Sequence, residues 1–414
     1  MSDDDLRPPP IGAPNWRTDV DAPREQDIVS CVSCGLCLPH CPTFRLTGRE
    51  SASPRGRIAA MRAVQEGQAT IDATFTTMMD ECLACRACET ACPSGVPFGR
   101  MIEAARAQIE PTRPITTRGL RALGLRHVLR RPWMMFTAGY ALALAQAIRL
   151  DRLAPQRLRA TSPQVSLWSL IRRIPRQLGH GPSAEILCGC VMDVAFRDVQ
   201  RDTMRAVAGA GYTAHRTTSG GCCGALAMHY GQPETARALA RARIAEFADA
   251  EVVVANSAGC SNHMKTWGHL LEDDPEWGPR AARVAERVRD LLEIDIPVVE
   301  QPRGQVACHD ACHHINGQSL GDDLRRIVRS AGGIPVEIPG GGRCCGAAGL
   351  YSVLEPELSA QLRRQKAEAI IATGAATVAV ANPGCAIQIA AGLQELQSSV
   401  QVIHPAQMTS HTER

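Results

Sequence analysis

The chain lacks the features of an enzyme that binds a nucleotide cofactor. No GxGxxG stretch opens a helix after a predicted strand in its 414 residues, so the sequence indicates neither a nicotinamide nor a flavin site. Aromatic residues make up only 4% of the chain, so its cores are expected to consist mainly of Ala, Leu, Val and Ile. The acidic, proline-rich start, MSDDDLRPPP, has neither the basic nor the apolar region of a signal peptide. We therefore expect a cytoplasmic protein with reduced thiols.

Charge is distributed unevenly, although the net charge is only +3. Residues 111–180 contain thirteen arginines, no lysine and a single acid, Asp151, yet no nucleic-acid-binding motif accompanies them, so we expect no nucleic-acid partner. Within this region residues 132–148, PWMMFTAGYALALAQAI, carry no charge. The segment is short for a bilayer span. It is interpreted either as a buried or partner-facing helix or as a helix on an anionic membrane surface.

Cysteine, in contrast, is abundant, with eighteen residues. Eight of them form two motifs with the pattern CxxCxxCxxxCP, namely CVSCGLCLPHCP and CLACRACETACP. Three thiols on one tight loop can bind three corners of a [4Fe–4S] cluster, and in paired motifs the fourth cysteine ligates the other cluster. Zinc sites favour pairs of CxxC or Cys/His mixtures instead. The predicted ligands are Cys31, Cys34, Cys37 and Cys92 for cluster 1, and Cys41, Cys82, Cys85 and Cys88 for cluster 2.

The other ten cysteines fall into an internal repeat. AEILCGC, SGGCCGALAMHY and VVVANSAGC recur as GQVACHDAC, GGGRCCGAAGLY and VAVANPGC, at offsets of 122, 122 and 125 residues. Such self-similarity predicts two homologous domains. In each, short β-branched runs (252–255, 378–381) alternate with helical stretches (233–248, 356–372), which predicts parallel α/β folds with the cysteines in glycine-rich loops or at strand ends.

Each repeat can bring four thiols together, with Cys188 or Cys308 as a fifth. The hypothesis is a further iron–sulfur centre or another redox site; the alternative is a set of small buried residues with no ligand role. Nearby histidines (His263, His309, His313, His314) are candidates for ligands or proton transfer, although second-shell roles are commoner. The candidate residues are Cys190, Cys222, Cys223 and Cys260 in the first repeat, and Cys312, Cys344, Cys345 and Cys385 in the second.

These patterns predict five segments. They are a flexible tail (1–27), a mainly α-helical two-cluster ferredoxin-type domain (28–110), an Arg-rich helical linker (111–180), and two homologous α/β domains (184–300 and 301–414). Within the second segment, Ser53 and Pro54 are expected to begin a helix that ends at Gly67.

The two motifs, the intervening PRGRI, CETACPSGV and the two CCG repeats together resemble the iron–sulfur subunit of bacterial glycolate oxidase, from about residue 28 to the end. Glu50, just ahead of SPRGR, and His404-Pro405 fit the same family. Heterodisulfide-reductase subunits also share CCG repeats, but theirs end in CxxC, where this chain has CSNH (His263) and CAIQ (Gln388). That departure makes disulfide reduction an unfavoured alternative.

The resemblance implies an electron-transfer subunit with two [4Fe–4S] clusters and no catalytic residues of its own. FAD-containing partner subunits would oxidise glycolate, or D-lactate, and this chain would pass the electrons to a quinone or another acceptor, in the cytoplasm or at the cytoplasmic face of the inner membrane. Three alternatives stay open: the same role for a lactate or glycerol 3-phosphate dehydrogenase, a self-sufficient heterodisulfide-reductase-like enzyme, and a cluster-bearing assembly factor.

Overall fold

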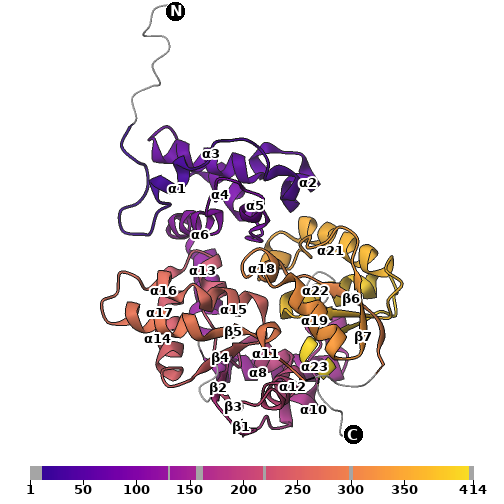
Figure 1. Cartoon of the computed structure of the whole chain (residues 1–414). Helices are drawn as coiled ribbons and strands as arrows, with labels where there is room; N and C mark the ends of the chain where they lie inside the picture. The colour runs from indigo at the N-terminus through magenta and orange to yellow at the C-terminus, as the bar shows by residue number, and fades with distance from the viewer. Residues whose placement is uncertain (1–11, 129–130, 155–161, 218–220, 298–301, 410–414) are drawn as a thin grey trace, which may run out of the picture. The chain divides into compact units, whose positions relative to one another are not determined.

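The computed structural model describes residues 12–128, 131–154, 162–217, 221–297 and 302–409. The chain divides into two compact units (Figure 1). Unit 1 comprises residues 1–118 with the short segment His229–Gln232, and unit 2 comprises residues 119–228 and 233–414.

Unit 1 is helical, as predicted for the cluster-binding domain. Its core is made of methionine, isoleucine and phenylalanine side chains, among which Met61, Met79 and Met101 are fully buried. The cysteine loops lie between short helices that this core holds in place. The helices are α1 (Glu25–Val29), α2 (Pro42–Thr47), α3 (Pro54–Gln65), α4 (Ala73–Asp80), α5 (Ala87–Thr90) and α6 (Phe98–Ile109).

Helix α3 begins where the sequence predicts. The side chain of Ser53 accepts a hydrogen bond from the N–H of Gly56 at 2.9 Å, and Pro54 is the first helical residue. Gln65 is the last helical residue and Glu66 the C-cap, and Gly67 follows with φ of 71°, so this glycine ends the helix as predicted. A Cβ atom at Gly56 would lie 2.1 Å from the carbonyl oxygen of Glu50, so the glycine of PRGR allows a close backbone approach.

Residues 12–24, within the predicted flexible tail, pack on the helices of unit 1, and residues 1–11 of that tail lie outside the described residues. Trp16 donates a hydrogen bond to the side chain of Gln65 at 2.8 Å, and its ring meets Phe75 edge-on with centroids 6.0 Å apart. The buried amide of Gln108 accepts the N–H of Arg17 at 2.7 Å. Docking of residues 12–24 thus depends on one aromatic side chain and on backbone hydrogen bonds, neither of which produces a periodic sequence pattern.

Unit 2 contains two sheets, in the order β1-β3-β2-β4-β5 and β7-β6-β8-β9. All neighbours are parallel except β1 and β3, so each repeat has the same four-stranded parallel core, as predicted. Strand β1, at the end of the predicted helical linker, adds an antiparallel edge. The strands are β1 (Gln177–Leu178), β2 (Ser183–Ile186), β3 (Thr213–Arg216), β4 (Val252–Ala255), β5 (Val288–Asp290), β6 (Gly304–His309), β7 (Gly333–Glu337), β8 (Thr377–Val380) and β9 (Gln401–Ile403).

The two repeats share one hydrophobic core. Ile186 and Met204 of the first repeat belong to the same buried cluster as Val306 and Leu324 of the second. The repeats therefore cannot separate without exposing this cluster.

The helices that follow the linker strand are α11 (Val191–Ala195), α12 (Arg197–Gly209), α13 (Ala225–His229), α14 (Pro233–Glu246), α15 (Ala258–Lys265), α16 (Trp267–Leu270), α17 (Trp277–Arg287), α18 (Cys312–Ile315), α19 (Gly321–Ser330), α20 (Tyr351–Leu354), α21 (Pro356–Ile371), α22 (Pro383–Glu395) and α23 (Pro405–Thr409).

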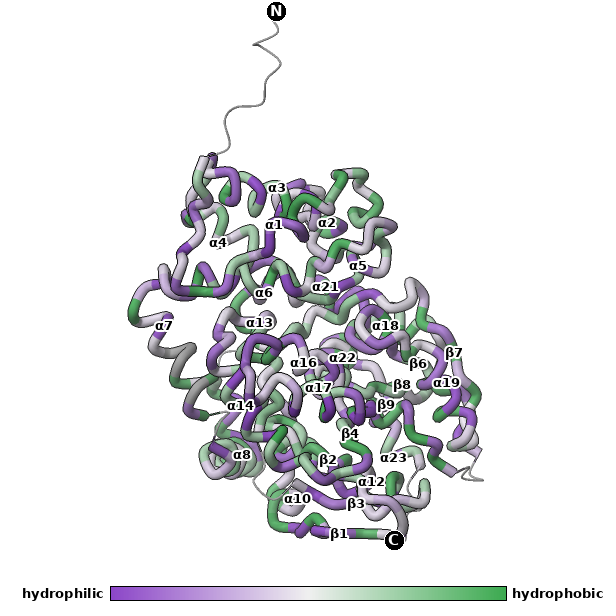
Figure 2. The backbone as a smooth tube through the Cα atoms, turned by 60° about the vertical axis from the view of Figure 1, so that its left-hand side comes forward, coloured by the Kyte–Doolittle hydropathy of each residue, from purple (hydrophilic) through white to green (hydrophobic). Residues whose placement is uncertain are grey.

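The uncharged segment forms helix α8 (Pro132–Ala147), which is apolar on both sides. One side packs on α11 so closely that a Cβ at Gly139 would lie 2.3 Å from Val194. The other side is a solvent-exposed stripe that the interpretation as a buried helix does not account for. In Figure 2 the tube of α8 is mostly green or pale. The largest members of the exposed stripe are Trp133, Tyr140, Leu144 and Ile148, and their exposed fractions are 61%, 41%, 55% and 63%.

Among the helices of the described residues, none has both the length and the apolar character needed to cross a membrane.

Candidate metal centres

The two CxxCxxC loops have the same backbone conformation. Ser33 and Gly35 have φ values of 56° and 82°, and Ala84 and Arg86, at the equivalent positions, have 49° and 60°. A loop that alternates between right- and left-handed residues curls into a concave turn with its N–H groups inside, which suits an anionic cluster. The N–H of Ala84 already points at the sulfur of Cys82, at 3.4 Å.

The first predicted set of thiols lines one pocket. Cys31, Cys34 and Cys37 surround it from the first loop, and Cys92 enters from the end of the second motif, with Cys88 of the second set also on its wall. Burial raises the pKa of the Cys37 thiol, and the nearby charges of Cys31 and Cys34 raise it further. This set is the more accessible one, since Cys34 is exposed.

The second set is formed by the second loop and Cys41. The pKa of the Cys88 thiol is raised well above its usual value, first by burial and then by the negative charges of Cys85, Cys82 and Cys41. Cys41, at the start of α2, is buried and lies 3.3 Å from the hydroxyl of Thr43. The structure thus brings together the two crossed sets, and both fit a [4Fe–4S] cluster: four thiols around a loop with inward N–H groups.

Arg55 and Glu50 support the first loop. The guanidinium group of Arg55 binds the two carboxylate oxygens of Glu50 at 2.8 and 3.1 Å. Its remaining nitrogen donates to the carbonyl oxygen of Ser33 at 3.3 Å. The PRGR segment therefore connects helix α3 to the loop that carries Cys31, Cys34 and Cys37. Beside that loop, Val29, Val32 and Leu36 form an apolar rim with exposed fractions of 59%, 69% and 56%.

In the first CCG repeat the four predicted thiols form one chain of contacts. Cys190 and Cys223 donate hydrogen bonds to Cys222, which lowers the pKa of Cys222 well below its usual value, and Cys223 also contacts Cys260. The N–H of Gly224 lies 3.4 Å from the Cys222 sulfur. All four thiols therefore converge on one site, in which the paired cysteines are buried and Cys190 and Cys260 are half-buried.

The second repeat brings its four thiols together in the same way. Cys344 contacts Cys312 and Cys345, and Cys345 contacts Cys385. Cys385 also accepts a hydrogen bond from the side-chain amide of Asn382 at 3.3 Å.

The elements that carry these cysteines differ from the prediction. Cys260 and Cys385 lie in the first turns of helices α15 and α22, and Cys312 is the first residue of α18. The paired cysteines and Cys190, the residue before α11, lie in loops, as predicted. The reason is that a helix follows each of these strands almost directly, so the carboxyl edge of the sheet coincides with helix N-termini.

The two candidates for a fifth thiol are both buried. Burial raises the pKa of Cys188 to about 12, and its sulfur lies 4.0 Å from the carbonyl oxygen of Thr217. Cys308 packs into the core that the two repeats share, where burial raises its pKa to about 11. That position does not favour Cys308 as a fifth ligand, whereas for Cys188 the hypothesis stays a prediction.

Each repeat also places one buried cation near its thiols, which the sequence analysis missed. Arg243 of α14 lies close to Cys222, and Lys366 of α21 lies close to Cys312, Cys344, Cys345 and Cys385. Burial lowers the pKa of Lys366, whereas the thiolates oppose that shift. Lys366 is one of only two lysines in the chain. This rarity, together with an alignment of the two repeats, could have indicated the residue from the sequence. A buried positive charge beside four thiols suits an anionic metal–thiolate centre.

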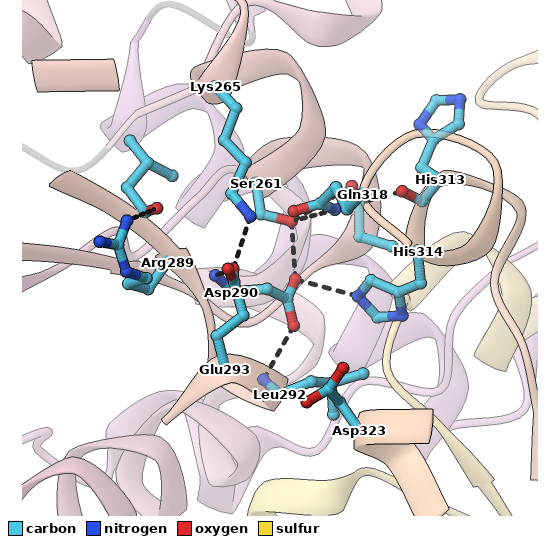
Figure 3. A network of polar contacts seen from close by, with 12 residues as sticks. Ser261, Lys265, Arg289, Asp290, Leu292, Glu293, His313, His314, Gln318 and Asp323 are labelled. Carbon is cyan, nitrogen blue, oxygen red and sulfur yellow. Dashed lines mark hydrogen bonds and ion pairs between the residues drawn. The ribbon is translucent and has the colours of Figure 1, made fainter. Parts of the chain in front are cut away.

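A buried polar network joins the two repeats (Figure 3). The carboxylate of Asp290, from the first repeat, accepts hydrogen bonds from Ser261 at 2.6 Å and from His314, of the second repeat, at 2.9 Å. Burial alone would raise the pKa of Asp290, but the charge and hydrogen bonds of His314, together with Ser261, outweigh it and lower the pKa. Gln318 completes the network by donating to Ser261 at 2.9 Å. His314 is therefore an interface residue.

Comparison with known proteins agrees with this architecture. Residues 27–96 match the family model of a 4Fe-4S dicluster domain, and residues 184–265 and 306–390 match that of a cysteine-rich domain called CCG.

Two curated relatives align with this chain over more than nine tenths of their own length. The probable glycolate oxidase iron-sulfur subunit of Bacillus subtilis is 33% identical over 93% of this chain and 94% of its own length. The glycolate oxidase iron-sulfur subunit of Escherichia coli is 31% identical over 91% of this chain and 93% of its own length. Lactate utilization protein A of Bacillus cytotoxicus, 26% identical, covers 53% of this chain. The chain belongs to the family of glycolate oxidase iron–sulfur subunits.

Proposed function

We propose that this chain is the electron-transfer subunit of a glycolate oxidase complex, a glycolate dehydrogenase with a non-NAD acceptor. An FAD-containing partner oxidises glycolate, or the related D-lactate, to the 2-oxo acid with loss of two electrons and two protons. The clusters, when bound, accept those electrons one at a time and pass them to a quinone or another acceptor. Full-length similarity to two glycolate oxidase iron–sulfur subunits supports this function.

The observation that carries the electron-transfer role is the interlocked arrangement of the two thiol sets. Cys92 lies with the first loop and Cys41 with the second. We therefore assign Cys31, Cys34, Cys37 and Cys92 to cluster 1, and Cys41, Cys82, Cys85 and Cys88 to cluster 2. Crossing holds the clusters at a fixed short separation, because each motif contributes to both sites.

Cluster 1 is the candidate for contact with a redox partner. Its ligand Cys34 is exposed, whereas Cys41, Cys82 and Cys88 of cluster 2 are buried. The rim of Val29, Val32 and Leu36 beside cluster 1 offers apolar surface for docking. Electron transfer to or from another protein would use this face of unit 1.

A second candidate function is the same role for a different flavin-dependent dehydrogenase of lactate or glycerol 3-phosphate. Similarity to lactate utilization protein A favours a lactate enzyme, although it covers only about half of the chain. A heterodisulfide-reductase-like activity is less well supported. Gln388, at the position of the missing last cysteine, donates to the hydroxyl of Ser359 at 2.7 Å and is engaged in the scaffold.

We also propose that α8 attaches the protein to the cytoplasmic face of an anionic membrane. Its exposed stripe is flanked in the sequence by Arg131, Arg149 and Arg152. Within the described part of the chain, none of the three forms an ion pair with a carboxylate. Apolar and aromatic side chains with flanking arginines suit the boundary between acyl chains and anionic headgroups.

Vesicle sedimentation tests this attachment. The protein should pellet with phosphatidylglycerol vesicles and much less with phosphatidylcholine vesicles, and Leu144→Glu should abolish the difference. Leu354→Glu, at an exposed leucine of the second repeat, is the matched control and should bind like the wild type. Equal binding by wild type and Leu144→Glu would contradict the assignment of the stripe.

Affinity purification from the native organism tests the function. The chain should be recovered with FAD-containing subunits, and the complex should reduce an artificial acceptor with glycolate. A preferred turnover of lactate or glycerol 3-phosphate would select the second candidate. Recovery of the chain alone, active on a substrate and free of flavin, would overturn the subunit role.

A further inference from the structure

His309 occupies an unusual position in the second CCG repeat. It is the last residue of β6, with an exposed fraction of 1%, and neither of its ring nitrogens has a hydrogen-bond partner. One ring nitrogen and the sulfurs of Cys345 and Cys385 all lie within 4.8 Å of one another. Buried polar atoms are almost always paired, and one that is not suggests a missing water or ion.

Strand alternation explains why this histidine, and not the neighbouring cysteine, faces the thiols. Val306 and Cys308 point into the core shared by the two repeats, whereas Ala307 belongs to the cluster that contains Cys345 and Cys385. Successive side chains of a strand point to opposite faces, so His309 shares the face of Ala307. Cys308 is thereby directed away from the site.

We propose that the second CCG repeat binds a thiophilic transition-metal ion through a mixed set of ligands, in which the imidazole of His309 joins the thiolates of Cys345 and Cys385. Ligands around one tetrahedral ion with bonds of about 2.0–2.3 Å lie roughly 3.5–3.8 Å apart, so a set within 4.8 Å of one another needs little movement. Cys344, in contact with Cys345, is placed to supply the fourth ligand of such a site, and Cys312 lies beside Cys344.

Other residues around the site suit this ligand set. Lys366 is buried beside the four thiols and donates to the carbonyl oxygen of Gly341 at 3.2 Å, so it offsets the negative charge of the thiolates without competing as a ligand. Asn382 donates to the sulfur of Cys385 at 3.3 Å, which orients that ligand.

The first repeat differs in where its histidine comes from. There His263, three residues after Cys260, approaches the paired cysteines: its Nε2 would lie 3.2 Å from a Cβ at Gly224. In the second repeat Gln388 takes the position of His263 and is hydrogen-bonded to Ser359. A histidine thus reaches both sites, but from a helix in one repeat and from a strand in the other. This inference is independent of the substrate and of the redox partners.

Metal analysis of the full-length protein, purified without oxygen, tests the proposal. The two N-terminal clusters account for about eight irons. The wild type should contain metal beyond these: additional iron with sulfide if the ion belongs to a cluster, or about one zinc if it is a single ion. His309→Ala should lose this additional metal, while the signals of the N-terminal clusters in electron paramagnetic resonance stay unchanged.

Two further variants make the test independent of folding. His309→Cys should keep the metal but lose one metal–nitrogen contribution, measured by pulsed electron paramagnetic resonance for iron or by X-ray absorption for zinc. Cys308→Ala, on the opposite face of the same strand, should change neither. A wild type with no metal beyond eight irons would overturn the proposal, as would a nitrogen contribution that survives unchanged in both His309 variants.

Discussion

Protonation of His404 should lower the free energy of unfolding in mild acid. His404 is buried and links the repeats: Nε2 donates to the carbonyl oxygen of Asn256 at 3.0 Å, and Nδ1 accepts the N–H of Ala406 at 3.1 Å. The neutral ring satisfies both contacts, whereas protonation of Nδ1 would replace an acceptor with a donor. Burial is the main reason that the pKa of His404 falls from 6.5 to about 4.

The magnitude follows from this shift of the pKa. Because the unfolded chain binds a proton near pH 6.5 and the folded chain only near pH 4, the stabilising effect of the neutral ring is complete above pH 6.5 and is lost as the pH falls toward 4. The full difference is about 3.4 kcal/mol. Between pH 7.5 and pH 5.5 the expected loss is about 1.3 kcal/mol.

Urea unfolding followed by circular dichroism measures this loss. The wild type should lose about 1.3 kcal/mol more than His404→Gln between pH 7.5 and pH 5.5, because glutamine keeps a donor for Asn256 but does not titrate. The exposed His180 provides the control, since His180→Gln should behave like the wild type. Equal losses in the wild type and His404→Gln would refute the reasoning.

Three further predictions follow from the other sites. Cys92→Ser should remove the paramagnetic signal of the cluster nested in Cys31, Cys34 and Cys37, and Cys41→Ser that of the other cluster; the reverse pattern would exclude crossed ligation. Leu36→Asp should slow electron exchange with the flavin subunit, measured by stopped-flow absorbance, without changing the cluster signals; an unchanged rate would exclude the rim as the docking face. Asp290→Ala should lower the unfolding free energy by about 3–5 kcal/mol, because it leaves His314 buried without its carboxylate. As a control, Glu368→Ala breaks the exposed pair with Arg364 and should lower it by only about 0.3–0.5 kcal/mol. Equal losses in the two variants would contradict the role of the network.

The sequence predicts most reliably those features that depend on local spacing. The two CxxCxxC loops and the start of α3 at Ser53 depend on residues that are close in the chain, so their pattern is visible without a structure. The repeat offsets likewise predict two similar sheets, because homologous segments fold alike.

Features that depend on packing could not be predicted in the same way. Cys308 and His309 are neighbours in the chain, and only the register of β6 against β8 decides which of them faces Cys345. The stripe on α8 has a similar origin: the segment is apolar throughout, so its sequence does not indicate which side packs on α11. Docking of residues 12–24 depends on Gln108, about ninety residues away.

The shared core of the repeats has a consequence for the two CCG sites. Asn382 accepts hydrogen bonds from the hydroxyl of Ser257 and the N–H of Gly259, next to Cys260, while its amide donates to Cys385. One side chain therefore contacts the helix that carries a thiol of the first site and a sulfur of the second. The hydrogen bonds of Asn382 thus join the start of α15 to the Cys385 sulfur, an arrangement that two repeats folded apart from one another could not form.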